Sequence, residues 1–429
     1  MRAFCCFSEE QHHPLWSAGL GWNISQEPFM EPAKWIDYMK LRLTYGINGN
    51  VDQTSSTYFV ARYRTLSQDP TYSQYLYYTD DNLPNPQLRW ERTSTFNLGV
   101  DFRLFKSVLS GSLEYYNRTG SDLLVRKYLD STLGATQRVI NNGKMRNQGV
   151  ELSLRGNIVH TNDWDFSANL TLGYNTNKML YVEHSATDIA SSFITAPANY
   201  LIQGTSYNTV WAYRLSRVVN GYPVILDANG NEMATFDAEG NPTSVTVTST
   251  LKGIDALKNC GSVLPKYNGS MQFNLRWKNL EANALFVFSG GNVLRLDVPD
   301  MNSYNLTSTL INDRWTAGDG DGKVRLLYDI PTDIQQYAGT FSEWWKYSDQ
   351  QIRKADYMKL RNISVAYSLP DRLTSRIGFG TTKLSLQVNN LFYLSAAGHD
   401  IDPEAYGLNT ASRSLLQPRS FSIGFSTSF

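Results

Sequence analysis

The sequence has no long hydrophobic run. Among its 429 residues, the longest clear apolar stretch extends only from Ala284 to Phe288. A membrane-spanning helix needs about 20 consecutive apolar residues, so a helical membrane protein is excluded. Any crossing of a bilayer must therefore be made by a closed β-barrel, the other structure that satisfies every backbone polar group in lipid.

Cysteine and histidine are scarce. There are three cysteines, of which Cys5 and Cys6 are adjacent and Cys260 is alone, and there are five histidines. This pattern gives neither a disulfide framework nor the ligand spacing of a zinc site. No His-Glu-x-x-His, Gly-x-Ser-x-Gly or phosphate-binding motif occurs. We therefore predict that the protein is not an enzyme and holds no metal and no cofactor.

Excess charge of either sign is also absent. Lysine plus arginine and aspartate plus glutamate both number 39, so the formal net charge is zero. Nucleic-acid binding selects a basic surface, and this balance argues against it. Aromatic residues, in contrast, are plentiful, with 26 tyrosines and 10 tryptophans. Tyrosine and tryptophan are typical of membrane–water interfaces and of surfaces that stack on sugars.

Apolar and polar residues alternate along many segments, which is the period of a β-strand with two different faces. Several of these runs approach the 9–11 residues of a tilted membrane strand, whereas soluble strands most often have about 5–6. We predict eleven strands, at residues 15–25, 38–48, 93–104, 108–117, 150–159, 164–175, 268–277, 280–289, 357–369, 382–391 and 420–429.

Short and long connections alternate between these strands, with two of intermediate length. Short periplasmic turns and long extracellular loops are the outer-membrane pattern. The predicted fold is thus an all-β, transmembrane antiparallel β-barrel. If the chain ends in the periplasm, its first strand runs inward, so we expect only the C-terminal part of a barrel. The start lacks the apolar segment of a signal peptide. We interpret residues 1–14 as an irregular or non-native start and residues 15–429 as a partial barrel from a longer chain.

Charged residues indicate which face of each strand meets lipid. Lys40 and Arg42 lie on one face of a single strand, as do Asp101 and Arg103 on another. A lysine or arginine facing lipid at mid-membrane costs about 2–4 kcal/mol. We therefore predict that these four residues line the lumen. The alternative is a soluble or surface-attached, glycan-binding all-β protein, because soluble sheets with one wet face also alternate.

Several segments resemble the SusC/RagA family of TonB-dependent outer-membrane transporters. Each match is weak alone, but their shared order along the chain is specific. The segments are LWSAGLGWNIS (15–25), YMKLRLTYGINGN (38–50), NPQLRWE (85–91), NQGVEL (147–152), DYMKLRNISVAYSLP (356–370), VNNLF (388–392), DPE (402–404) and PRSF (418–421).

This resemblance implies energised import of glycan oligomers, or sometimes peptides, across the cell outer membrane. It implies a SusD-like surface lipoprotein as a lid and the TonB complex as the energy source. Large transporters of this kind have 22 strands and a plugged lumen, so eleven strands are about half of a barrel. The family's plug domain and TonB box precede the barrel, and neither is recognisable in this sequence. Two unpaired edges are untenable in lipid, so we expect the chain not to transport alone.

Three further features are candidates for function. Terminal Phe429, preceded by alternating aromatics, resembles the assembly signal of outer-membrane proteins. Loop aromatics could stack on sugars or contact the lid, although packing within folded loops is the alternative. These candidates are Tyr75, Tyr77, Tyr78, Trp344 and Trp345. Asp227–Asn231 and Asp237–Asn241 look like hairpin turns, which we favour over calcium sites because no glutamate completes a calcium loop.

Overall fold

The structure is a computed structural model of the 429-residue chain. Statements about structure refer to the residues that it describes. These are residues 14–50, 62–65, 76–79, 85, 87–130, 132, 137–182, 189–197, 200–303, 309–316, 319, 322–327, 330–374, 378–407 and 412–428.

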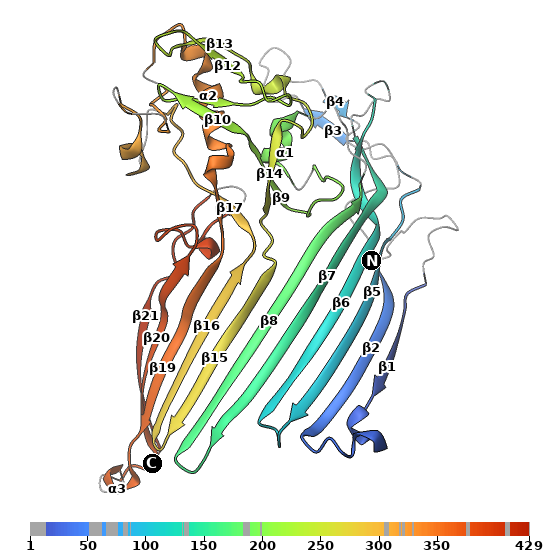
Figure 1. Cartoon of the computed structure of the whole chain (residues 1–429), viewed down its shortest axis with the longest axis vertical. Helices are drawn as coiled ribbons and strands as arrows, with labels where there is room; N and C mark the ends of the chain where they lie inside the picture. The colour runs from blue at the N-terminus through green and yellow to red at the C-terminus, as the bar shows by residue number, and fades with distance from the viewer. Residues whose placement is uncertain are drawn as a thin grey trace.

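Eleven strands of the described chain form one curved antiparallel sheet, in which sequence neighbours pair side by side (Figure 1). All eleven predicted strands are confirmed, and most extend further than predicted. In sheet order they are β1 (Trp16–Trp22), β2 (Ile36–Asn50), β5 (Glu91–Leu104), β6 (Leu109–Tyr128), β7 (Gln137–His160), β8 (Trp164–Tyr181), β15 (Tyr267–Trp277), β16 (Leu280–Gly290), β19 (Tyr357–Ser368), β20 (Thr382–Ser395) and β21 (Ser420–Thr427).

The pairing register divides the sheet into two chemically different faces. One row of directly opposed residues runs across seven strands and is entirely apolar or aromatic. That row is Leu20, Leu43, Leu98, Tyr115, Val150, Tyr174 and Tyr267. A row on the other face is Lys40, Asp101, Ser112, Ser153, Thr171 and Ser270. We call these the apolar face and the polar face. Because side chains alternate along a strand, a slip of one residue would exchange the two faces, so the pattern fixes the register.

The apolar face is exposed in the chain alone. Leu20, Ile423 and Phe421 retain 75%, 86% and 68% of their accessible surface. A soluble sheet packs its apolar side on a core, so exposure over a whole sheet marks a surface that meets another apolar medium. At one end of this face Trp164 and Trp277 stack with ring centroids 5.4 Å apart. This end of the face has the aromatic composition of a membrane interface.

Connections at the two ends of the sheet differ in length (Figure 1). At the end that we call the turn end, β5 joins β6, β7 joins β8, and β15 joins β16 by tight turns. Phe105, Lys106 and Ser107 all have positive φ in the first of these turns. Two intermediate connections hold short helices, namely η2 (Ile24–Gln26), η3 (Pro28–Met30) and α3 (Asp371–Thr374). No helix in the described part of the chain is long and apolar enough to span a membrane.

The opposite end, the loop end, carries folded structure that the strand pattern did not predict. Its small strands are β3 (Arg62–Thr65), β4 (Leu76–Thr79), β9 (Thr209–Tyr213), β10 (Leu215–Val219), β11 (Tyr222–Ile225), β12 (Ala234–Phe236), β13 (Pro242–Val245), β14 (Leu257–Ser262), β17 (Val293–Arg295) and β18 (Ile352–Lys354). Its helices are α1 (Ala190–Thr195), α2 (Ala338–Lys346), η5 (Thr248–Thr250), η6 (Thr309–Asp313), η7 (Gln335–Tyr337), η8 (Asp349–Gln351) and η10 (Pro403–Ala405).

Two long connections, β8 to β15 and β16 to β19, share one hydrophobic core at this end. Phe193 and Tyr213 come from the first connection, and Phe341 and Trp344 come from the second; all four are fully buried. The Tyr213 hydroxyl donates to Glu343 at 2.9 Å, and the Tyr213 backbone N–H donates to the carbonyl of Tyr347. The two connections therefore form a single packed unit, which we call the loop domain.

Candidate functional site

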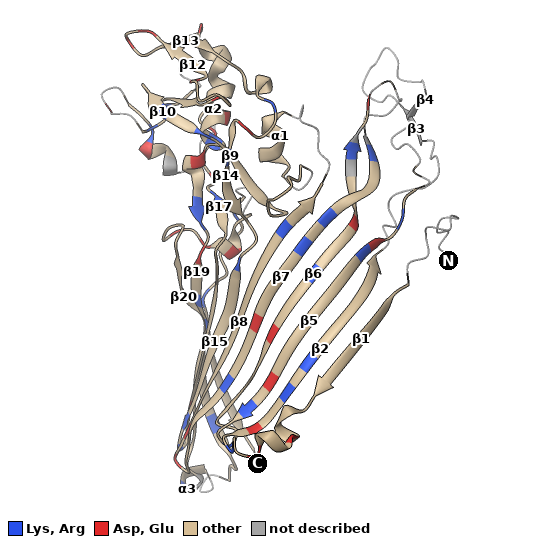
Figure 2. Cartoon of the chain, turned by 45° about the vertical axis from the view of Figure 1, so that its right-hand side comes forward, with Lys and Arg blue, Asp and Glu red and all other residues tan. Residues whose placement is uncertain are grey.

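The polar face carries three groups of charged side chains, and the first is centred on Arg42 of β2. Its Nε donates to the Asp101 carboxylate of β5 at 2.7 Å, and its Nη2 donates to the same carboxylate at 2.9 Å. The same Nη2 also contacts Glu114 of β6, while Glu151 of β7 lies directly opposite Glu114. Figure 2 shows the charged residues along these neighbouring strands. One guanidinium thus bridges two carboxylates on adjacent strands.

The remaining predicted lumen residues lie on the same face. Lys40 is directly opposite Asp101 in the register, and the Arg103 guanidinium lies over the Tyr38 ring at 5.0 Å from its centroid. The structure therefore brings Lys40, Arg42 and Asp101 together, with Arg103 two residues beyond Asp101 on β5. Their placement on the polar face agrees with the prediction. That they line a lumen remains a proposal.

A second group lies on the polar face at the turn end, around a hollow of about 600 Å³. Arg276 of β15 pairs with Asp165 of β8 at 3.8 Å, and Lys383 of β20 pairs with Glu281 of β16. Asparagine, glutamine and serine side chains from β15, β16, β19 and β20 share the lining with Leu275, Ala282 and Ala366. This hollow presents both signs of charge together with amide groups, a surface suited to another polar chain or a hydroxylated ligand.

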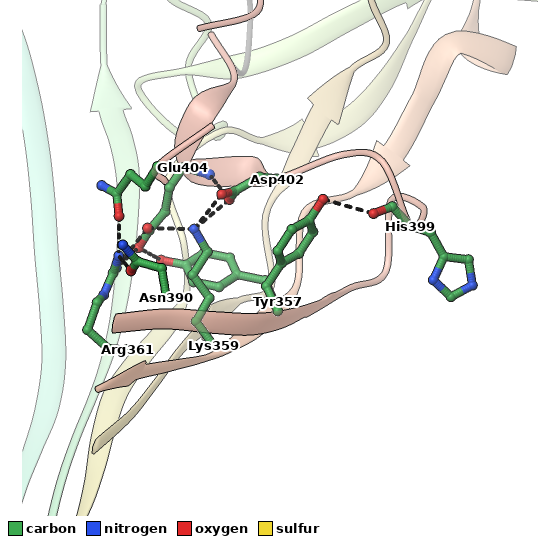
Figure 3. A network of polar contacts seen from close by, with 9 residues as sticks. Tyr357, Lys359, Arg361, Asn390, His399, Asp402 and Glu404 are labelled. Carbon is green, nitrogen blue, oxygen red and sulfur yellow. Dashed lines mark hydrogen bonds and ion pairs between the residues drawn. The ribbon is translucent and has the colours of Figure 1, made fainter. Parts of the chain in front are cut away.

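The third group is a buried ion network at the loop end of β19 (Figure 3). The Lys359 ammonium lies 2.6 Å from Asp402 and 2.7 Å from Glu404. Arg361 donates to Glu404 at 2.7 Å, and the Tyr357 hydroxyl donates to the same carboxylate at 2.7 Å. Lys359 and Asp402 are each only 5% exposed. A buried lysine is stable as a cation only when paired, and here two carboxylates surround it.

This network ties the connection between β20 and β21 to the wall of the sheet. Burial raises the pKa of Glu404, but hydrogen bonds from Lys359, Tyr357 and Arg361 outweigh it and lower that pKa to about 2. Glu404 is therefore ionised at neutral pH. Arg361 reaches a further point of the same connection, because its Nη1 donates to Gln417 at 2.6 Å. The connection is thus fixed across the polar face at two places.

Sequence reasoning did not assign this network, although two signals for it were present. Tyr357, Lys359 and Arg361 alternate on one strand face, and the Asp-Pro-Glu segment at residues 402–404 supplies two carboxylates. The hexapeptide DYMKLR occurs at residues 37–42 and 356–361. Its lysine and arginine lie on the polar face in both copies, but at the turn end of β2 and at the loop end of β19. In both copies, basic side chains of the hexapeptide form ion pairs with carboxylates from other parts of the chain.

Two of the candidate loop aromatics, Trp344 and Trp345, pack against the core of the loop domain. Trp344 is 0% exposed and packs in the core of the loop domain, with its ring centroid 5.5 Å from that of Phe341. The prediction that Trp344 presents a stacking surface is therefore wrong, because contacts with a second loop bury it. Trp345 is partly buried against the same core and keeps some exposed surface. Its contact with a ligand or partner remains a proposal.

Other predicted sites lie partly or wholly outside the described residues. Tyr75 and Phe429 are outside them, and Tyr77 and Tyr78 are described only as backbone of β4. The aspartate turn at residues 227–231 is confirmed as a hairpin turn, because the Asp227 N–H donates to the Asn231 carbonyl at 2.9 Å and Leu226 pairs antiparallel with Glu232. Among the described residues, no group of three or more histidine, cysteine, aspartate or glutamate side chains has the arrangement of a metal site.

Comparison with known proteins agrees with this architecture. The family model described as TonB dependent receptor-like, beta-barrel matches residues 6–391. TonB-dependent receptor P3 of Formosa agariphila is 24% identical over 425 residues, which cover 93% of this chain and 39% of that protein. TonB-dependent receptor SusC of Bacteroides thetaiotaomicron is 25% identical over 402 residues, covering 90% and 37%. The chain thus spans well under half the length of these curated relatives.

A solved structure of the RagAB peptide transporter superposes with a TM-score of 0.71 at 22% identity, covering 99% of this chain and 44% of that one. This likeness confirms the predicted fold, an antiparallel sheet that is part of a TonB-dependent receptor barrel. The family match decides against the soluble alternative, because the apolar side of an outer-membrane barrel faces lipid. The chain belongs to the TonB-dependent receptor-like β-barrel family and is a SusC/RagA-like, non-enzymatic protein of the outer membrane.

Proposed function

We propose that this chain forms part of the wall of an outer-membrane, TonB-dependent transporter that imports glycan oligomers or peptides. The observation that carries the proposal is a single sheet of eleven paired strands whose register separates a row of opposed apolar or aromatic residues on one face from a row of polar residues on the other. An apolar outside and a charged inside are what a membrane pore requires. The turn end then faces the periplasm, and the loop end faces the exterior.

Lys40, Arg42, Asp101 and Arg103 line the lumen in this proposal. Within the described sheet, β1 and β21 each pair with a single neighbour, so each presents one free edge. An unpaired strand edge is too costly to leave in lipid. The working wall therefore includes further strands that pair with both edges and close the barrel.

A SusD-like surface lipoprotein is the proposed lid over the loop end, and the TonB complex is the proposed energy source. The loop domain supports the first part of this proposal, because a packed unit with its own core is a firm platform for a partner. Pre-organised surfaces bind with little ordering cost. Trp345, Tyr77 and Tyr78 are the proposed loop contacts for the lid or the cargo.

The proposed cargo is a glycan oligomer or a peptide. The hollow around Arg276 and Lys383 supports such polar cargo, because it offers charges of both signs together with amide groups. The names of similar proteins do not decide between the two classes. RagAB is described as a peptide transporter, whereas the names of SusC and TonB-dependent receptor P3 state no cargo. Measuring uptake of both classes therefore decides between glycan and peptide.

Uptake by the native host tests this function. A strain lacking the gene and a strain restored with it are offered radiolabelled glycan oligomers and radiolabelled peptides, with and without an uncoupler of the proton gradient. We expect one class to accumulate only in the restored strain and only when the gradient is intact. Equal accumulation of both classes in the two strains would refute the proposal.

A further inference from the structure

Two cations lie directly opposite each other on the apolar face, near its loop end. Arg146 of β7 pairs in register with Lys178 of β8. On β8 the apolar face continues from Tyr174 through Thr176 to Lys178, and on β7 it continues from Val150 to Arg146. Lys178 is thus four residues beyond a tyrosine that is 48% exposed. At about 3.3 Å per residue, this is about 13 Å further along the strand.

The height of this pair matches the headgroup layer. Strands tilted by about 35–45° convert 13 Å along the strand into about 10 Å along the membrane normal. Tyr174 and the directly opposed Tyr267 are both exposed on the apolar face, and tyrosine is enriched at the hydrocarbon boundary. Arg146 and Lys178 therefore project sideways from the sheet at the level of the outer leaflet's polar groups, and not into the hydrocarbon or the lumen.

Among the described residues, neither side chain has a counter-ion. Both residues are exposed, and no ion pair or side-chain hydrogen bond joins either of them to another described residue. The residue opposite Arg146 on its other side is Thr119 of β6, which is uncharged. Directly opposed residues have Cβ atoms about 5 Å apart, so like charges at these positions repel. An anion between the two groups removes this repulsion.

A third cation repeats the arrangement. Arg92 of β5 is exposed and lies on the apolar face four residues beyond Phe96, just as Lys178 follows Tyr174. Its guanidinium has one weak contact, to the Ser121 hydroxyl at 3.4 Å. The apolar face thus ends in outward-facing cations on three of the four adjacent strands β5, β6, β7 and β8.

We propose that Arg146 and Lys178 form a binding site for the phosphate group of an outer-leaflet lipid. The guanidinium matches phosphate oxygens in a bidentate geometry, and the ammonium adds a second charge. The acyl chains of the same lipid lie along Val150, Tyr174 and the apolar residues below them. The paired cations lie one polar pair, Gln148 and Thr176, beyond the apolar surface, and this arrangement selects a phosphorylated lipid over a soluble anion.

Lipid retention tests this site. The full protein is extracted from outer membranes in a mild detergent, and bound lipids are counted by native mass spectrometry for the wild type, R146Q, K178Q and R146Q/K178Q. We expect phosphorylated lipid per protein to fall at least fivefold in the double variant and by an intermediate amount in each single variant. We expect the wild type to rebind a dephosphorylated lipid with the same acyl chains as weakly as the double variant binds the phosphorylated lipid.

The matched control is R118Q/R155Q, which removes two cations from the polar face of β6 and β7. This variant is expected to retain wild-type lipid, and heat-modifiable gel migration checks that every variant is folded. Equal retention by R146Q/K178Q and the wild type would overturn the proposal, as would equal binding of the dephosphorylated lipid. The inference needs the outer-membrane location but not transport, so a failed uptake experiment leaves it standing.

Discussion

At the scale of single residues, alternation decides most of the chemistry. Lys40 and Arg42 are separated by Leu41, which places both cations on one face of β2 and the leucine on the other. The sequence was sufficient to predict this, because the period of a strand is two. It was not sufficient to identify the partners of Arg42, since Asp101 and Glu114 come from two strands far along the chain.

Replacing Arg42 tests the value of that bridge. In Arg42→Gln, the carboxylates of Asp101 and Glu114 lose their shared cation and repel each other. Because these groups are about one-third exposed, we expect the free energy of unfolding to fall by only about 1 kcal/mol. Denaturant unfolding in micelles measures it. Arg103→Gln, whose guanidinium lies over a tyrosine ring, is the control and should lose less. Equal losses would contradict the bridge.

Trp344 and Trp345 are a matched pair for testing the loop domain. Trp344 is fully buried, so Trp344→Ala leaves a large cavity and should destabilise the loop domain by about 3–5 kcal/mol. Trp345 is only partly buried, and Trp345→Ala should cost clearly less. Limited proteolysis of intact protein measures both, through cleavage between residues 200 and 260. Similar cleavage rates for the two variants would contradict the assigned burial.

At the scale of elements, strands were predictable and loop structure was not. Each long strand contains its own signal, because one face must be apolar over its whole length. The loop domain has no such local signal. Its core forms only when the connection holding Tyr213 meets the connection holding Trp344, more than 100 residues later. The same limit explains why the network around Lys359 was missed: Asp402 and Glu404 come from another connection.

Glu404 tests how that network fixes a loop. In Glu404→Gln, Lys359 keeps Asp402, but Arg361 and Tyr357 lose their shared carboxylate. We expect amide hydrogen exchange over residues 398–407 to accelerate at least tenfold. Asp400→Asn is the control, because Asp400 is exposed and makes no hydrogen bond or ion pair with the described residues of the network. Unchanged exchange in Glu404→Gln would show that the network does not hold the loop.

The pH dependence of the same loop has a definite sign. The pKa of Glu404 is lowered from its ordinary value of 4.5 to about 2, so the folded loop favours the ionised form. Its contribution is fully present above about pH 4.5 and is lost as the pH falls toward 2. Loop protection, read by pulsed proteolysis, should therefore be constant from pH 8 to 5 and decrease below that range. A loss already at pH 6 would contradict this assignment.

At the scale of the whole molecule, the proposed function depends on which face of the sheet meets lipid. Leu41 and Leu43 lie on the apolar face, with Lys40 and Arg42 between them on the polar face. Assignment to an outer-membrane receptor family agrees with this orientation, on which the proposed lumen and the proposed lipid site depend. The orientation was predictable from the sequence, because placing cations in lipid costs several kcal/mol.

Spin-label accessibility over residues 40–43, in the full protein in outer membranes, is the most direct test of this orientation. Single cysteines are introduced at each position in a background with the native cysteines replaced. We expect labels at positions 41 and 43 to be relaxed by oxygen, which concentrates in lipid, and labels at 40 and 42 by a water-soluble nickel complex. The reverse pattern, with nickel reaching 41 and 43 and oxygen reaching 40 and 42, would contradict the account.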